Sequence, residues 1–218
     1  MVNQTKTQLI PGAVVIAVAF VSGFCIMTIE MLGARIMAPY FGGSQYVWGS
    51  IITIFMLALA LGYLLGGRLS MRNPNPVTYA MFFIAAAVFS LPIILFADVI
   101  MQPIFLTIDD PRYGSLFASI AMYFVPTCIL GMISPYSVRL LVKSHEHSGH
   151  MAGKLYFVST IGSAAGTLGT SFYFVLYFDV NQILWGSIAA LISTGCFILL
   201  FNYFLNNAAS RSQAQNYG

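Results

Sequence analysis

Long apolar runs alternate with short polar segments along the whole chain. Each run is close to the ~20 residues that an α-helix needs to cross the hydrocarbon core of a bilayer. The pattern predicts an all-α, polytopic membrane helix bundle in which one domain, residues 10–205, holds six transmembrane helices. The six predicted spans are Ile10–Met37, Tyr46–Gly67, Val77–Ile100, Ser115–Leu141, Leu155–Phe178 and Ile183–Leu205.

The two ends of the chain lie outside these runs. Residues 1–9 are predicted to form a short cytoplasmic segment. Residues 206–218 are polar and lack apolar periodicity, which predicts a disordered cytoplasmic tail. The first apolar run follows Lys6, as a signal peptide would, but no small-residue cleavage site follows and the run continues to Glu30. We therefore expect a retained helix.

The composition also indicates a protein embedded in a lipid bilayer. Of the 218 residues, 59% are hydrophobic and 7% are charged, whereas about a quarter of the residues in soluble domains are charged. The net charge of +3 is scattered and gives no basic patch for nucleic acid. Cys25, Cys128 and Cys196 fall within separate apolar runs without CxxC spacing, which is typical of buried thiols.

Charged residues near the ends of the predicted spans indicate an orientation. Basic residues lie beside alternate loops and near both termini: Lys6, Arg68, Arg72, Arg139, Lys143, Lys154 and Arg211. The opposite loops and span ends carry Asp98, Asp109, Asp110, Arg112 and Asp179. Because cytoplasmic loops are enriched in lysine and arginine, we expect a multi-pass protein of the cell inner (plasma) membrane. Both termini would be cytoplasmic, and the outer side would be acidic.

A carboxylate and a guanidinium, Glu30 and Arg35, occupy the outer part of the first predicted span. A charge in hydrocarbon is costly unless it meets a partner or faces a protein-lined cavity. Side chains five residues apart on a helix point about 140° from each other. A direct pair would therefore need local unwinding before Pro39, which we expect to end the helix. Structural ion pairing and a functional role both stay open.

The turn after this span combines glycines with amphipathic aromatics. Gly42 and Gly43 permit a tight reversal of the chain. Tyr40, Tyr46 and Trp48 are the residue types expected at the level of the lipid headgroups. The hairpin of the first two spans is therefore where a functional hypothesis starts.

Two prolines, Pro126 and Pro135, lie inside the fourth predicted span with Gly131 between them. Proline in a spanning helix frees backbone carbonyls and produces a kink or a break. One interpretation is a bent helix whose free carbonyls are met by Thr127 and its neighbours. The other is a broken helix that binds a solute near the midplane, as in transporters.

Small residues line the fifth predicted span. Gly162 and Gly166 form a GxxxG motif, and Ser159, Ser163 and Gly169 widen the flat face. Such faces let helix backbones approach closely in lipid, so the motif predicts helix packing inside the bundle. A homodimer interface and a substrate-lining face are the alternatives.

Three imidazoles are close together in one polar loop, at His145, His147 and His150, beside Glu146. Such a group can hold zinc or another divalent ion. The segment has no supporting scaffold, however, so we expect a solvated loop that changes charge near neutral pH. We expect neither a metal nor a cofactor.

Five motifs follow one another along most of the chain: Glu30 and Arg35; Gly42, Ser44 and Tyr46; Leu61, Gly62, Gly66, Gly67 and Leu69; Pro126, Thr127, Gly131 and Pro135; and Gly153, Leu155 and Tyr156 before the fifth-span glycines. In this order they resemble the transmembrane part of membrane-bound spermidine synthase-like proteins, also described as fused transporter–spermidine synthase proteins. The resemblance implies a link to polyamine metabolism. The soluble aminopropyltransferase domain of the fused members has no counterpart in this sequence, so we expect no aminopropyl transfer.

Two functions are compatible with this resemblance. The first is a small transporter-like unit for a polyamine or other cationic amine. Its candidate substrate-binding residues are Glu30, Arg35, Tyr46, Trp48, Asp98 and Asp179. Glu30 would be the counter-charge, the aromatics would offer ring faces to an ammonium group, and the acidic outer side would concentrate cations. Six helices equal half of a major facilitator fold, so a homodimer would enclose the pathway.

The second function is a non-catalytic membrane anchor or subunit for a separately encoded spermidine synthase-like enzyme. Glu30 and Arg35 would then form a structural ion pair. Basic residues would form a cytoplasmic docking side: Arg68, Arg72, Arg139 and Lys143.

Overall fold

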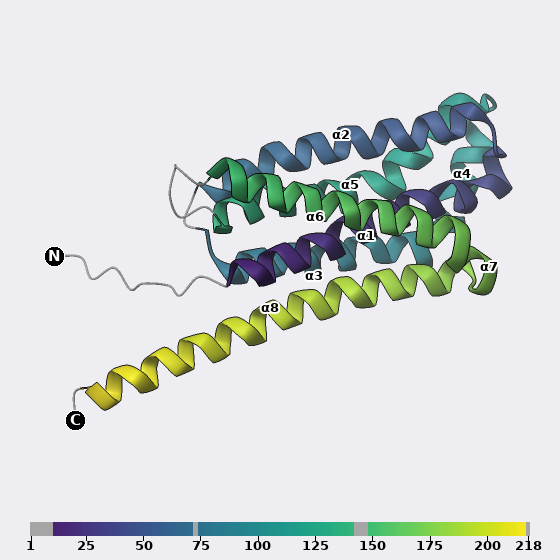
Figure 1. The fold of residues 1–218 in the computed structure, drawn as a ribbon. Helices are drawn as coiled ribbons and strands as arrows, with labels where there is room; N and C mark the ends of the chain where they lie inside the picture. Colours follow the sequence, from purple (N-terminus) through teal and green to yellow (C-terminus); the bar gives the residue numbers. More distant parts are fainter. Residues whose placement is uncertain (1–10, 72–73, 142–147, 217–218) are drawn as a thin grey trace.

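The computed structural model describes residues 11–71, 74–141 and 148–216, and within these ranges it contains helices and no strand. The elements are α1 (Gly12–Phe41), α2 (Gln45–Ser70), α3 (Pro76–Leu95), α4 (Ala97–Thr107), α5 (Pro111–Leu141), α6 (Ser148–Gly169), the π-helical turn η2 (Thr170–Phe174), α7 (Val175–Tyr177) and α8 (Val180–Asn216). The long helices run side by side along one axis, with α4 and α7 at the end opposite the start of α1 (Figure 1).

Five helices, α1, α2, α3, α5 and α8, are long and apolar enough to cross a membrane by length and composition. The prediction of an all-α fold is therefore confirmed, and these five apolar helices fit a multi-pass membrane protein. The helix α6 is not among the five. Serine, threonine and glycine occupy much of its length and lower its mean hydropathy.

The first helix is longer than predicted. Pro39 was expected to end it, yet α1 runs through Pro39 to Phe41. A proline in the last turn forfeits one backbone hydrogen bond, and the turn is closed instead by the Gly42 amide, which donates to the Ala38 carbonyl at 2.9 Å. The helix ends at Gly42, whose φ of 76° lies in the left-handed region that glycine adopts without strain.

The third predicted span is divided into two helices. The backbone leaves the helical region at Phe96, with φ −129° and ψ 15°, so α3 ends at Leu95 and α4 starts at Ala97. The prediction of one helix from Val77 to Ile100 is wrong. Pro92 lies within the last turn of α3 and removes a donor from it, which weakens the helix just before the break.

The predicted disordered tail is helical in part. The helix α8 continues past Leu205 to Asn216, so the boundary drawn at residue 206 does not match the structure. Alanine and glutamine are frequent in this segment, and no proline or glycine interrupts it before Gly218. Good helix formers without a stop signal continue a helix that is already nucleated.

Each long helix has one principal neighbour: α1 packs on α6, α2 on α5, and α3 on α8. Tyrosines are among the largest fully buried side chains between α3 and α5, and their hydroxyls are satisfied. The Tyr79 and Ser137 hydroxyls are 2.7 Å apart, and the Asn75 amide donates to the Tyr136 hydroxyl at 2.9 Å. Buried polar groups are hydrogen-bonded in stable cores, so this side of the bundle is a scaffold.

Candidate functional site

Glycines bring α1 and α6 into backbone contact. A Cβ atom added at Gly162 would overlap the Phe20 carbonyl, and one at Gly166 would overlap the Phe24 carbonyl. The contact is reciprocal, because a Cβ at Gly23 of α1 would overlap the Ser159 carbonyl of α6. Gly169 does not take part in this contact; a Cβ there would meet the ring of Phe174 at 3.3 Å. The GxxxG motif thus packs inside the chain.

The helices α2 and α5 repeat this contact. Here too, two glycines four residues apart on one helix contact two carbonyls four residues apart on the other helix. The helix that supplies the carbonyls also carries one glycine, which contacts a carbonyl of the first helix. The contacting positions are Gly62 on Cys128, Gly66 on Met132, and Gly131 on Leu59. The bundle therefore contains two helix pairs, α1/α6 and α2/α5, built on the same pattern of backbone contacts.

A cavity of about 320 Å³ lies between the two pairs and is lined by residues of α1, α2, α5 and α6. Hydroxyl groups are frequent in its wall: Ser22, Tyr63, Ser134, Tyr156, Ser159, Thr160 and Ser163. Most of the remaining lining is aliphatic, with Pro135 of α5 among it. The cavity is of the size of small-molecule sites, and it combines apolar walls with a few polar groups as such sites do.

Most of these hydroxyls are available to a ligand. Ser163 donates to the Gly23 carbonyl at 3.3 Å. Ser22 is only 5% exposed, and it makes no hydrogen bond within the ranges that the structure describes. Pro135 has no N–H group, so the Gly131 carbonyl one turn earlier lacks its usual helical donor. Unpaired buried polar groups are costly, and a polar solute or water in the cavity would satisfy the Ser22 hydroxyl.

Glu30 is not among the residues that line this cavity, but it lies one helical turn beyond them on the same face of α1. Ser22, Ile26 and Met27 line it, and Glu30 is the next position at helical spacing. Its side chain leans back toward Ile26 and Met27, because helical side chains tilt toward the N-terminus. Glu30 is 9% exposed, and across the described residues its carboxyl has no ion-pair or hydrogen-bond partner.

Arg35 is separated from this site. It is exposed whereas Glu30 is buried, as the difference of about 140° around the helix requires. The two side chains form no ion pair in the described part of the chain, so α1 remains helical through both positions without the local unwinding that a direct pair would need.

The other candidate residues gather at one end of the bundle. Tyr46 and Trp48 start α2, Asp98 starts α4 and Asp179 precedes α8, all at the end that holds α4 and α7 (Figure 1). None of these four lines the cavity. Asp98 accepts a hydrogen bond of 2.7 Å from the Tyr40 hydroxyl, which ties the end of α1 to α4.

Charge is divided between the two ends of the bundle. Arg68, Arg139 and Lys154 are exposed near the end of α2, the end of α5 and the start of α6, where the described parts of α1 and α8 also begin and end (Figure 1). The opposite end carries the aspartates 98, 109, 110 and 179 together with Arg112.

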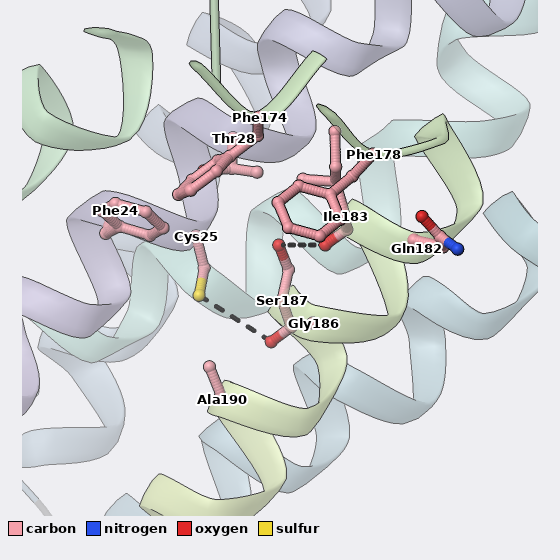
Figure 2. A pocket seen from close by; sticks show the side chains of 10 residues that line it. All are labelled: Phe24, Cys25, Thr28, Phe174, Phe178, Gln182, Ile183, Gly186, Ser187 and Ala190. Atoms are coloured by element: carbon pink, nitrogen blue, oxygen red, sulfur yellow. Dashed lines mark hydrogen bonds between the residues drawn. The ribbon is translucent and has the colours of Figure 1, made fainter. Parts of the chain in front are cut away.

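A second cavity, of about 250 Å³, lies between α1, η2 and α8 (Figure 2). Phe24, Phe174 and Phe178 form its aromatic wall. Its interior polar groups are satisfied within the protein: the Cys25 thiol donates to the Ser187 carbonyl at 3.8 Å, and the Ser187 hydroxyl donates to the Ile183 carbonyl at 3.1 Å. This apolar space offers no group that would select a charged solute.

No metal centre emerges among the described residues, which contain no group of three or more histidine, cysteine, aspartate or glutamate side chains that could hold an ion. His145, His147 and Glu146 lie outside the described residues, and only His150 of that loop lies within them. The prediction for this loop therefore stays a prediction.

The sequence analysis identified Glu30 and Pro135, and it named Ser159 and Ser163 on a face for which substrate lining was one alternative. It did not identify the other hydroxyls of the lining: Ser22, Tyr63, Ser134, Tyr156 and Thr160. Ser22 and Glu30 are eight residues apart, which is two helical turns and would have placed them on one face. Tyr63, Ser134 and Tyr156 carry no comparable signal, because only the packing of α2, α5 and α6 around α1 brings them together.

Together, the fold and the cavity define a class: a multi-pass membrane helix bundle with a hydroxyl-lined internal site. Comparison with protein-family models, curated proteins and solved structures finds no match. The resemblance to spermidine synthase-like membrane domains rests on the sequence motifs alone.

Proposed function

We propose that the protein is a small transporter-like unit that binds a cationic amine, such as a polyamine, in the cavity between the two helix pairs. The observation that carries this proposal is Glu30, a buried carboxyl without a partner among the described residues, one helical turn beyond the cavity-lining residues Ile26 and Met27 of α1. Ionisable residues within membrane spans are costly and mark solute or ion pathways. A cation is the partner that this carboxyl lacks.

The rest of the wall suits an ammonium group. Serine and threonine hydroxyls of the lining can accept its N–H donors. Tyr63 and Tyr156 line the same space from α2 and α6 and can offer ring faces to a cation. The aliphatic lining would contact the methylene chain of a polyamine. Cations would be attracted to the acidic end of the bundle before they enter the cavity. The residues proposed for this step are Tyr46, Trp48, Asp98 and Asp179.

The proposed membrane arrangement has six spans. The segment α6–η2–α7 would be the sixth, because it runs beside α1 along the bundle (Figure 1). The end that carries Arg68, Arg139 and Lys154 would face the cytoplasm, which puts both termini on the cytoplasmic side of the inner (plasma) membrane.

The two helix pairs support an internal repeat of the major facilitator kind. Exchanging α1 with α5 and α6 with α2 maps one set of backbone contacts onto the other. The α1/α6 pair runs opposite to the α2/α5 pair (Figure 1), which is the relation of inverted-topology repeats. Tyr63 and Tyr156 are about half exposed at the rim of the cavity, and a second copy of the chain would close it there.

The direct test is uptake of labelled putrescine and spermidine into proteoliposomes. Saturable uptake is expected for the wild-type protein, and Glu30→Gln should abolish it by removing the counter-charge. Asp109→Asn is the matched control, since Asp109 is exposed and outside the cavity. Wild-type uptake equal to that of empty vesicles, or uptake unaffected by Glu30→Gln, would overturn the proposal.

A second candidate, the membrane anchor for a separate synthase-like enzyme, is favoured by the grouping of Arg68, Arg139 and Lys154 at one end of the bundle. These exposed cations could dock an acidic surface of a soluble partner. Co-purification of a soluble aminopropyltransferase homologue with the wild-type protein, and its loss in an Arg68→Glu, Arg139→Glu variant, would support the anchor. Retention of the enzyme by that variant would remove it.

A further inference from the structure

The site also indicates which ion is exchanged for the solute. We propose that Glu30 is a proton-exchange site: it holds a proton when the cavity is empty and releases it when a cationic amine binds. This inference rests on the proposed function, because it requires the amine to occupy the same cavity.

The first step concerns the empty state. Glu30 is buried by protein and has no cationic partner within the described ranges. An isolated buried carboxylate is so unfavourable that such a group takes up a proton instead. With the acid neutral, the empty cavity carries no charge from this residue, which a cavity at membrane depth requires.

The second step concerns the groups that could compete for this role. The helices packed around this part of α1 bring tyrosines to it: Tyr123 of α5, and Tyr63 and Tyr156 of the cavity wall. The Tyr123 hydroxyl is occupied, since it donates to the Gly33 carbonyl at 3.4 Å.

Charged groups on the neighbouring helices lie elsewhere. Asp98 of α4 is bonded to Tyr40, Arg112 starts α5, and the remaining described cations occupy the basic end. On η2 and on α8 as far as Ala208, the titratable groups are Tyr173, Cys196 and Tyr203, all exposed and outside the cavity. The lining itself contains no aspartate or glutamate, and Glu30 is the described acid one helical turn beyond the α1 residues that line the cavity.

The third step is the exchange itself. An ammonium group enters the cavity, the O–H bond of the Glu30 carboxyl breaks, and the proton leaves to water. The carboxylate that remains pairs with this ammonium group. Hydroxyls of the cavity lining, such as that of Ser22 about two helical turns away, can accept N–H donors from a second ammonium group of a polyamine. One proton is released for each amine bound, so the pair of acid and ammonium is as neutral as the protonated acid was before.

The test measures proton release and binding on the same sample. Purified full-length protein in weakly buffered detergent solution, with a pH-indicating dye, is mixed with putrescine or spermidine adjusted to the same pH. Equilibrium dialysis gives the amount bound. We expect about one proton per bound amine for the wild-type protein and for Asp109→Asn. Glu30→Gln should release none, and the conservative Glu30→Asp should retain release.

A second measurement covers variants that bind weakly. If binding displaces one proton, the Kd for spermidine should fall about tenfold for each pH unit while the empty-state Glu30 remains protonated, and the Kd of Glu30→Gln should not follow pH. Amine binding without proton release, with a Kd independent of pH, would overturn the exchange while leaving the proposed function in place. Absence of amine binding by the wild-type protein would overturn both.

Discussion

The two helix pairs, α1/α6 and α2/α5, share their backbone contacts but differ in the chemistry that they present. In each pair, glycines four residues apart meet carbonyls of the neighbouring helix, and one reciprocal glycine completes the contact. The α1/α6 pair carries Glu30 and most of the cavity hydroxyls, while the α2/α5 pair contributes mainly aliphatic groups and the kink at Pro135. Close packing needs only the glycines, so the cavity faces are free to differ.

The largest effect is expected from a methyl group placed in the α1/α6 contact. Gly162→Ala puts a Cβ against the Phe20 carbonyl, and rigid backbone cannot give way as a side chain can. We expect a loss of about 1–3 kcal/mol, seen as a lower apparent thermal midpoint by circular dichroism in detergent. Gly153→Ala in the same helix has open space and should be neutral or stabilising, because alanine favours helix. Equal midpoints for the two variants would contradict the contact.

The next prediction asks whether the second pair is equivalent to the first. Gly66→Ala would place a Cβ 2.5 Å from the Met132 carbonyl oxygen, whereas Gly67→Ala, one residue on, meets nothing within 4 Å. The loss for Gly66→Ala should match that for Gly162→Ala, again about 1–3 kcal/mol in thermal unfolding. If Gly66→Ala left stability unchanged while Gly162→Ala lowered it, the two contacts would contribute unequally to stability. That result would count against the internal repeat.

A smaller and different effect is expected from the cavity hydroxyls. Ser22→Ala removes a hydroxyl without a partner among the described residues, so stability should change little. Spermidine binding should weaken by about 10- to 150-fold, since a hydrogen bond to a charged group contributes about 1.5–3 kcal/mol. Ser187→Ala is the control in the apolar cavity of Figure 2, where the hydroxyl bonds to the Ile183 carbonyl. The affinity of Ser187→Ala for spermidine, measured by equilibrium dialysis, should equal that of the wild-type protein. A tenfold loss of affinity in this variant would show that spermidine binds in the apolar cavity instead.

The smallest effect is expected at the acidic end. Tyr40→Phe removes an exposed hydrogen bond to Asp98 and should change stability little, because water can replace the lost partner. Amine uptake should slow slightly, if at all, because both residues lie outside the cavity. Measured at low and high salt, any change in uptake rate should disappear at high salt, as screening removes long-range attraction. A complete loss of uptake would move the binding site to this end.

The sequence predicted those parts of the molecule that depend on local pattern. Apolar runs located the membrane helices, and the helical period correctly separated Glu30 from Arg35. The break at Phe96 and the course of α1 through Pro39 were missed, because a proline near a helix end can be tolerated or can end the helix.

The cavity could not have been predicted from local pattern. Ser134 and Tyr63 belong to it only because α2 packs on α5, with both of them beside the α1/α6 pair. That choice of neighbours is a property of the three-dimensional packing. The GxxxG motif predicted a close helix–helix contact. It did not indicate that the backbone carbonyls of Phe20 and Phe24 lie opposite the two glycines.

The central proposal is that the cavity between the two pairs binds cations, and the reactivity of a cysteine placed in its wall tests this most directly. In a chain whose cysteines are replaced by alanine, Ser134→Cys places a thiol in the cavity wall, and Met56→Cys places one on the outer face of α2, where Met56 is 66% exposed. The reagent is a cationic, membrane-impermeant methanethiosulfonate. We expect fast modification of Ser134→Cys that spermidine slows, and little reaction of Met56→Cys in lipid. An unreactive Ser134→Cys, or a rate that spermidine leaves unchanged, would contradict the account.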